Sequence, residues 1–153
     1  MKLEDQYDKI FRYLYFHLHD RHTAEDLTQE TFLRFLKSRT YHDENRQLQY
    51  LYTIARNLAH QHYRDQCITY TLDTFALEEQ KDTQLSENFE SPLLEQITLR
   101  DALQKLSPAE RELLFLRYVN DVPVSVISGM YKISRFAVYR KLKIILGRIR
   151  REL

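Results

Sequence analysis

Apolar residues recur at helical spacing along most of the chain. Near its end, Val138, Leu142, Ile145 and Ile149 stand four, three and four positions apart, which is the spacing of one face of an α-helix. No valine- or threonine-rich segment alternates as a strand would, and only two glycines and three prolines interrupt the sequence. The pattern predicts an all-α fold with helices near 4–19, 23–38, 46–65, 93–105, 108–119, 124–131 and 134–151.

Two of these helices have recognisable starts. Ser107, Pro108 and Glu110 form the pattern of a capping box with proline at the first helical position. Thr23 is expected to begin the second helix, with Glu25 and Asp26 in its first turn, where acidic side chains are favoured by the helix dipole.

The last two helices are predicted to form a helix-turn-helix. The helix at 124–131 is followed by a turn at 131–133, and Ser134 can cap the longer helix after it. If the apolar face of that helix packs inward, Arg135, Phe136, Tyr139, Arg140 and Lys143 point outward, where they could contact bases and phosphates. A solvated helix that closes a bundle or a helix on a membrane surface are alternative interpretations of this segment.

Charge is distributed unevenly along the chain. Lys plus Arg against Asp plus Glu number 10 and 10 in residues 1–66, 1 and 7 in 67–98, and 12 and 5 in 99–153, although the net charge is only +1. The C-terminal third is therefore about +7 and the middle about −6, which suggests that one part meets a polyanion. We predict two small helical domains, at 1–66 and 93–153, joined by a flexible acidic linker at 67–92.

Several classes of protein are disfavoured by the composition. No run approaches the roughly 18 apolar residues of a membrane span, and the acidic, polar N-terminus does not resemble a secretory signal. Cys67 has no partner for an internal disulfide, and the histidines lack the spacing of metal ligands. We therefore expect a cytoplasmic protein with no metal and no cofactor. No catalytic motif is present, so we expect no enzymatic activity.

Three stretches resemble bacterial RNA polymerase sigma factors of the extracytoplasmic-function (ECF) group, in the sigma-70 family. Region 2 of that family resembles HTAEDLTQETFLRFLKS, and its promoter-melting segment resembles YLYTIARNLAHQHYRD. Region 4 resembles LSPAERELLFLRYVNDVPVSVISGMYKISRFAVYRKLKIILGRIRR. The order and spacing of the stretches also agree, and the resemblance covers about residues 5–151.

The resemblance implies an alternative sigma factor that directs transcription initiation at specific promoters. Asp26, Gln29 and Glu30 are expected to bind the clamp coiled coil of the largest subunit of core RNA polymerase, and region 4 to meet its flap region. Promoter DNA and an anti-sigma factor are the other implied partners. The free protein is expected to be a monomer that does not insert into membranes.

Two sets of residues are expected to bind DNA. Recognition and melting of the minus-ten element are assigned to Tyr41, His42, Asp43, Asn45, Arg56, Asn57 and Arg64, since unpaired bases need aromatic or polar pockets to enter. Recognition of the minus-thirty-five element is assigned to Lys132, Ser134, Arg135, Phe136, Tyr139, Arg140 and Lys143.

The sequence departs from the family pattern at several positions. Tyr50 replaces the usual tryptophan, Gln61 replaces an aspartate, and Lys132 stands where a glycine usually forms the turn. Phe136 and Tyr139 replace polar residues of the recognition surface, so the promoter sequence cannot be transferred. A dimeric helix-turn-helix regulator and an adaptor that uses the basic helix only for packing remain alternatives.

Overall fold

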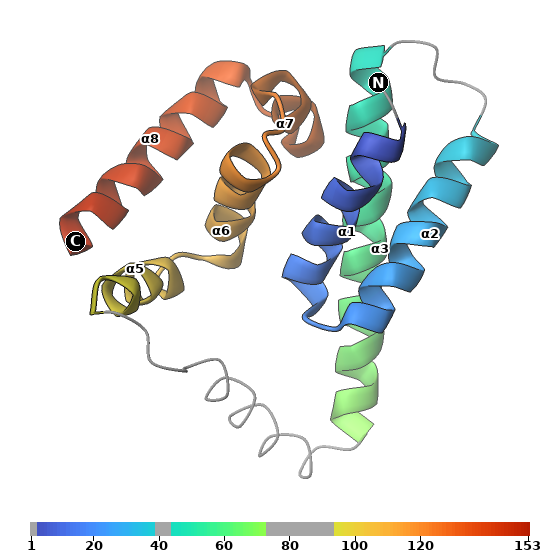
Figure 1. Cartoon of the computed structure of the whole chain (residues 1–153), viewed down its shortest axis with the longest axis horizontal. Helices are drawn as coiled ribbons and strands as arrows, with labels where there is room; N and C mark the ends of the chain where they lie inside the picture. Colours follow the sequence, from blue (N-terminus) through green and yellow to red (C-terminus); the bar gives the residue numbers. More distant parts are fainter. Residues whose placement is uncertain (1–2, 39–43, 73–93) are drawn as a thin grey trace.

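The N-terminal part of the chain is a three-helix module. The structure is a computed structural model that describes residues 3–38, 44–72 and 94–153, without the side chains of 44–45, 67–72 and 94–98. Helices α1 (Leu3–Leu18), α2 (Arg21–Lys37) and α3 (Glu44–Leu72) pack side by side (Figure 1). Helix α3 runs to Leu72, so residues 67–72, which we assigned to the linker, are helical.

The C-terminal part is a second helical module. It contains α5 (Leu94–Gln104), α6 (Pro108–Leu114), the π-helical turn η1 (Phe115–Val119), α7 (Val124–Tyr131) and α8 (Arg135–Glu152). The predicted capping box is confirmed, because the Ser107 side chain accepts from the Glu110 backbone N–H and the Glu110 side chain accepts from the Ser107 backbone N–H. No strand occurs in the ranges that the structure describes, which confirms the all-α prediction.

The predicted start of the second helix was wrong. Helix α2 begins at Arg21 with Asp20 at its N-cap, and the Thr23 hydroxyl donates to the Asp20 carboxylate at 2.5 Å. This hydrogen bond is the main reason that the pKa of Asp20 lies below its usual value. Glu25 and Asp26 consequently lie beyond the first turn.

The helix that begins at the capping box changes from α-helical to π-helical hydrogen bonding in η1. The Asn120 backbone N–H donates to the Phe115 carbonyl at 3.0 Å, five residues back, and the Val122 N–H donates to the Leu116 carbonyl at 2.8 Å. A π-helical turn holds one more residue than the equivalent α-helical turn. The turn therefore changes the direction in which the following side chains point.

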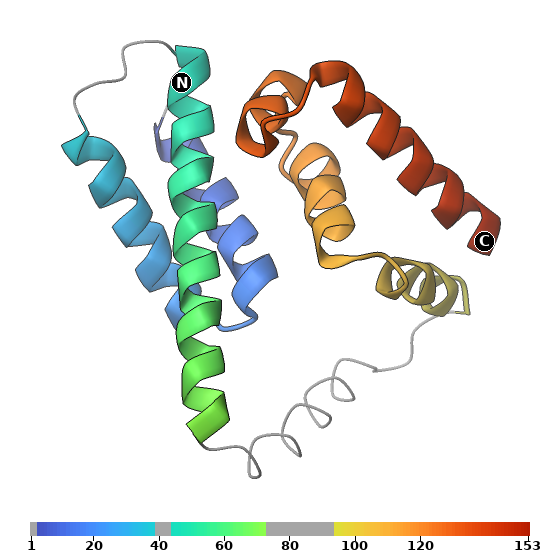
Figure 2. The same ribbon diagram turned by 180° about the vertical axis from the view of Figure 1, so that it is seen from behind.

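The two modules pack directly against each other (Figure 2). Their buried residues form one continuous cluster, in which Leu14 and Leu51 of the first module and Leu116 and Ile127 of the second are fully buried. Helix α3 contacts α7, and α1 contacts the segment formed by α6 and η1. The sequence had predicted the modules but not this shared core.

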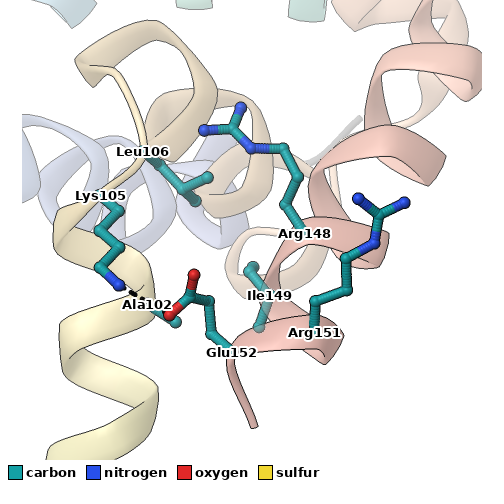
Figure 3. A pocket seen from close by; sticks show the side chains of 7 residues that line it. All are labelled: Ala102, Lys105, Leu106, Arg148, Ile149, Arg151 and Glu152. Carbon is teal, nitrogen blue, oxygen red and sulfur yellow. Dashed lines mark hydrogen bonds and ion pairs between the residues drawn. The ribbon is translucent and has the colours of Figure 1, made fainter.

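Helix α8 also packs on α5, at the edge of the second module. A shallow hollow between them is lined by the residues of Figure 3, and Lys105 pairs there with Glu152 at 2.7 Å. Leu106 and Ala102 are buried beneath it. Each helix in the described ranges is too short or too polar to span a lipid bilayer.

Candidate nucleic-acid interface

The turn between α7 and α8 is held by local hydrogen bonds. Lys132 adopts a left-handed conformation, with φ 57° and ψ 42°, as expected for a residue that takes the place of a turn glycine. The Ile133 backbone N–H donates to the Ser128 carbonyl at 3.1 Å, and the Ser134 side chain accepts from the Ala137 N–H at 3.0 Å. These bonds fix the direction in which α8 leaves α7.

The left-handed residue allows a test of stability. We expect Lys132→Gly to raise the free energy of unfolding by up to about 1 kcal/mol, because glycine adopts positive φ without the steric cost that a side chain brings. Lys132→Ala, which keeps a Cβ, is the matched control and should leave stability unchanged. Urea unfolding followed by circular dichroism measures both. A glycine variant less stable than the alanine variant would contradict the observed turn.

Helix α8 buries one apolar face and exposes its lysines and arginines. Val138, Leu142 and Ile145 are buried, and Ile149 is half-buried. The predicted outward face is confirmed as exposed, and it carries Arg135, Phe136, Tyr139, Arg140 and Lys143.

Two aromatic side chains shape the exposed face of α8. Phe136 is 72% exposed and Tyr139 is 59% exposed. The Arg140 guanidinium lies over the Phe136 ring, 5.6 Å from its centroid. This contact restrains the arginine while its N–H groups stay available for an acceptor such as a phosphate or a guanine edge.

The residues expected to bind polymerase lie on one exposed part of α2. Asp26 and Gln29 are exposed, and Glu30 is half-buried beside Arg34, with which it forms an ion pair at 2.8 Å. Leu33 and Leu36 lie on the same exposed part of α2 and are 52% and 61% exposed. Sequence reasoning missed these two leucines. Their exposure could have been predicted, because they do not share the helical face of the inward-facing Leu27 and Phe35.

The residues predicted for the minus-ten element have different surroundings. Asn57 and Arg64 are exposed on α3. Arg56 is half-buried against the second module, where its guanidinium lies 4.4 Å from the centroid of the Tyr131 ring. Asn45 lies in α3 with its side chain outside the described part. Residues 41–43, which include the predicted Tyr41, His42 and Asp43, lie outside the described residues.

A buried carboxylate that sequence reasoning missed lies where the two modules meet. Glu112 of α6 is only 4% exposed and accepts hydrogen bonds from Tyr131 at 2.8 Å and from Tyr13 at 3.1 Å. Its carboxylate also lies 3.3 Å from His17 Nε2 and 3.4 Å from Arg56 Nε. Glu112 stands four positions before the buried Leu116 and so lies on the same face of the helix. An acidic residue on an apolar face was the feature of the sequence that could have pointed to this cluster.

Burial and pairing act against each other on Glu112. Burial alone would raise the pKa of its carboxyl, but His17, the Tyr131 hydroxyl and Arg56 outweigh that effect and hold the pKa below its usual value. Burial and the negative charge of Glu112 raise the pKa of Tyr13 and that of Tyr131. The cluster therefore holds a carboxylate among neutral tyrosines. Among the described residues, no three His, Cys, Asp or Glu side chains lie together in a way that could hold a metal ion.

Comparison with known proteins identifies the family. A family model named Sigma-70 region 2 matches residues 3–67. The ECF RNA polymerase sigma factor BldN of Streptomyces coelicolor is 34% identical over 130 residues, which cover 81% of the chain and 48% of BldN. The RNA polymerase sigma factor CarQ of Myxococcus xanthus is 34% identical over 139 residues, which cover 84% of the chain and 78% of CarQ. The chain belongs to the ECF group of sigma-70 factors.

The matches extend over most of this chain but over different fractions of the two relatives. Matches over four fifths of the chain continue beyond the first module, although the chain spans only about half the length of BldN. The solved structure of an RsbN–BldN complex aligns with 99% of the sigma factor and 88% of the matched chain, at 26% identity and a TM-score of 0.34. An alignment this loose gives no information on how the modules are arranged.

Proposed function

We propose that this sigma factor binds core RNA polymerase and directs transcription initiation at promoters that it recognises through both modules. The first module takes the minus-ten element and opens it, and the second takes the minus-thirty-five element. The observation that carries the proposal is the exposed face of α8, where Arg135, Arg140 and Lys143 surround Phe136 and Tyr139 at the second helix of a helix-turn-helix. Such a helix is suited to the major groove.

The exposed part of α2 supports the polymerase half of the proposal. Asp26 and Gln29 offer acceptors and a donor to a basic partner, and Leu33 and Leu36 beside them offer apolar area. We assign this surface to the clamp of the largest subunit and the second module to the flap region. An anti-sigma factor that occupies the same surfaces would keep the protein from polymerase.

A reconstituted transcription assay tests this function. The purified protein is added to core polymerase from bacteria on a library of templates with randomised minus-ten and minus-thirty-five elements. We expect transcripts from a defined subset of templates only when both proteins are present. A stable dimer that binds DNA tightly without polymerase, and yields no transcript with it, would instead support a helix-turn-helix regulator.

A further inference from the structure

The contact between the two modules is specific in its side chains. Phe16 of α1 stacks on Phe115 of η1, with ring centroids 4.4 Å apart. Asn120, which is buried, donates to the Lys9 carbonyl at 2.8 Å and to the Tyr52 hydroxyl at 3.2 Å. These bonds connect residues more than 60 positions apart, so the contact has a defined geometry.

Helix α7 approaches α3 closely at Gly129. A Cβ built on this glycine would lie 2.0 Å from Oε1 of Gln49. A residue with a Cβ would fit there only if the end of the Gln49 side chain moved. The close approach is a second contact between the modules, separate from the Glu112 cluster.

At the centre of the contact, Glu112 forms an ion pair with Arg56, an arginine that we assign to DNA binding. The Arg56 guanidinium contacts both the Glu112 carboxylate, at 3.4 Å, and the face of the Tyr131 ring, and its Nη1 donates to the Met130 carbonyl at 3.4 Å. A carboxylate and a phosphate bind a guanidinium by the same charge-assisted hydrogen bonds. Glu112 therefore takes the place that a nucleic-acid phosphate would need.

The polar groups of this contact are incompletely satisfied. His17 Nε2, Arg56 Nε and Asn120 Oδ1 are buried without an aligned hydrogen bond, although the first two lie within ion-pair distance of Glu112. Buried polar groups without full hydrogen bonding cost free energy that hydration would recover. The contact between the modules therefore combines a shared apolar core with polar groups that water would solvate once the modules separate.

We propose that Glu112 is an internal latch that closes the free sigma factor by holding Arg56, so that this arginine reaches DNA only after the modules separate. The proposal rests on the proposed function, because it gives Arg56 a role in DNA binding. In the closed chain Asp26, Gln29 and the outward face of α8 stay exposed. Polymerase can therefore engage the closed form first, and its binding to separated modules draws the equilibrium toward the open form.

A reversible crosslink tests closure and its effect in one protein. In a Cys67→Ser background, Gln49→Cys and Gly129→Cys place two thiols at the close approach of α3 and α7, and loss of Gln49 removes the atoms that a Cβ at 129 would meet. Under mild oxidation we expect this pair to form a disulfide about tenfold faster than a control pair with Gln49→Cys and Arg151→Cys, because a closed chain holds only the first pair at high effective concentration. Arg151 belongs to the last turn of α8, and that end of the helix lies far from α3, which carries position 49 (Figures 1 and 2).

The oxidised and reduced forms are then compared in the transcription assay. We expect oxidation to lower transcript yield about tenfold or more, since a locked chain has no open population, and dithiothreitol to restore it. Crosslinking no faster than the control pair, or full activity of the oxidised form, would overturn the proposal. A wild-type chain that never supports transcription would instead refute the proposed function, while the crosslinking rate still measures closure.

Variants at Glu112 test the latch itself without any transcription. Glu112→Gln keeps the size of the side chain and an acceptor for the tyrosines but removes the charge that holds Arg56. We expect crosslinking of the 49/129 pair to slow several-fold, and the radius of gyration of the protein without engineered cysteines to rise in small-angle scattering. Glu152→Gln, which removes a carboxylate paired within the second module, should change neither. Equal crosslinking rates in the two variants would remove Glu112 from the proposal.

Discussion

Replacement of Asp26, Gln29 and Glu30 together by alanine should abolish binding of the protein to core polymerase while leaving it folded. Two of these side chains are exposed, and the third forms an ion pair with Arg34 one helical turn away. Such a pair contributes about 0.3–0.5 kcal/mol, and alanine is the best helix former, so the helix should persist. Polymerase binding by fluorescence anisotropy and helicity by circular dichroism measure the two effects separately.

Helix α1 provides the control. Glu4, Asp5 and Asp8 are exposed acidic residues on that helix, outside the proposed surface of α2. Alanine at these three positions should bind polymerase as the wild type does. If the Asp26 triple variant is folded and binds equally well, the clamp contact lies elsewhere on the molecule.

Alanine at Arg135, Tyr139 and Arg140 should remove most promoter-specific transcription. For Arg140→Ala alone we expect a loss of about 1–3 kcal/mol that is confined to one position of the minus-thirty-five element and relaxes the preference there. Arg140 is the sharpest single test because its guanidinium lies over Phe136, which restrains it at the exposed surface. Transcription from a randomised minus-thirty-five library gives both strength and preference.

Loss of a phosphate contact should affect transcription differently from loss of a base contact in the same module. Lys132→Ala should weaken all promoters by similar factors and reduce the slope of log affinity against log salt by about one unit. If the triple variant changes neither promoter strength nor preference, α8 does not read DNA, and the interpretation as an adaptor helix gains support.

Local chemistry made the helices and the turn predictable. The capping box at Ser107, the boundaries of α7 and the outward face of α8 follow from residues close together in sequence. The start of α2 was harder, since Asp20 and Thr23 both favour an N-cap and their relative positions allow Thr23 to donate to Asp20. The end of α3 was misplaced because residues 67–72 contain no glycine or proline to end a helix.

The contact between modules could not be predicted from one sequence. Glu112 and Tyr13 are 99 positions apart, and nothing in the pattern of either helix indicates the other. Arg56 was assigned to DNA binding from the resemblance to the family and from the chemistry of its side chain, and both arguments concern the first module alone. Its neighbours Tyr131 and Met130 belong to the second, so its surroundings depend on tertiary packing.

Because of the π-helical turn at 115–119, the contact between the modules depends on the number of residues in this segment as well as on the side chains that make the contact. Successive residues of an α-helix are rotated by about 100°, so one added residue turns everything after it by that angle. Here the residue that follows the turn is Asn120, and its amide faces Lys9 and Tyr52. A homologue that is shorter by one residue in this turn could keep every contacting side chain and still present a different one to α1. Insertions and deletions at 115–119 are therefore a route by which related sigma factors could gain or lose this coupling without any substitution at the interface.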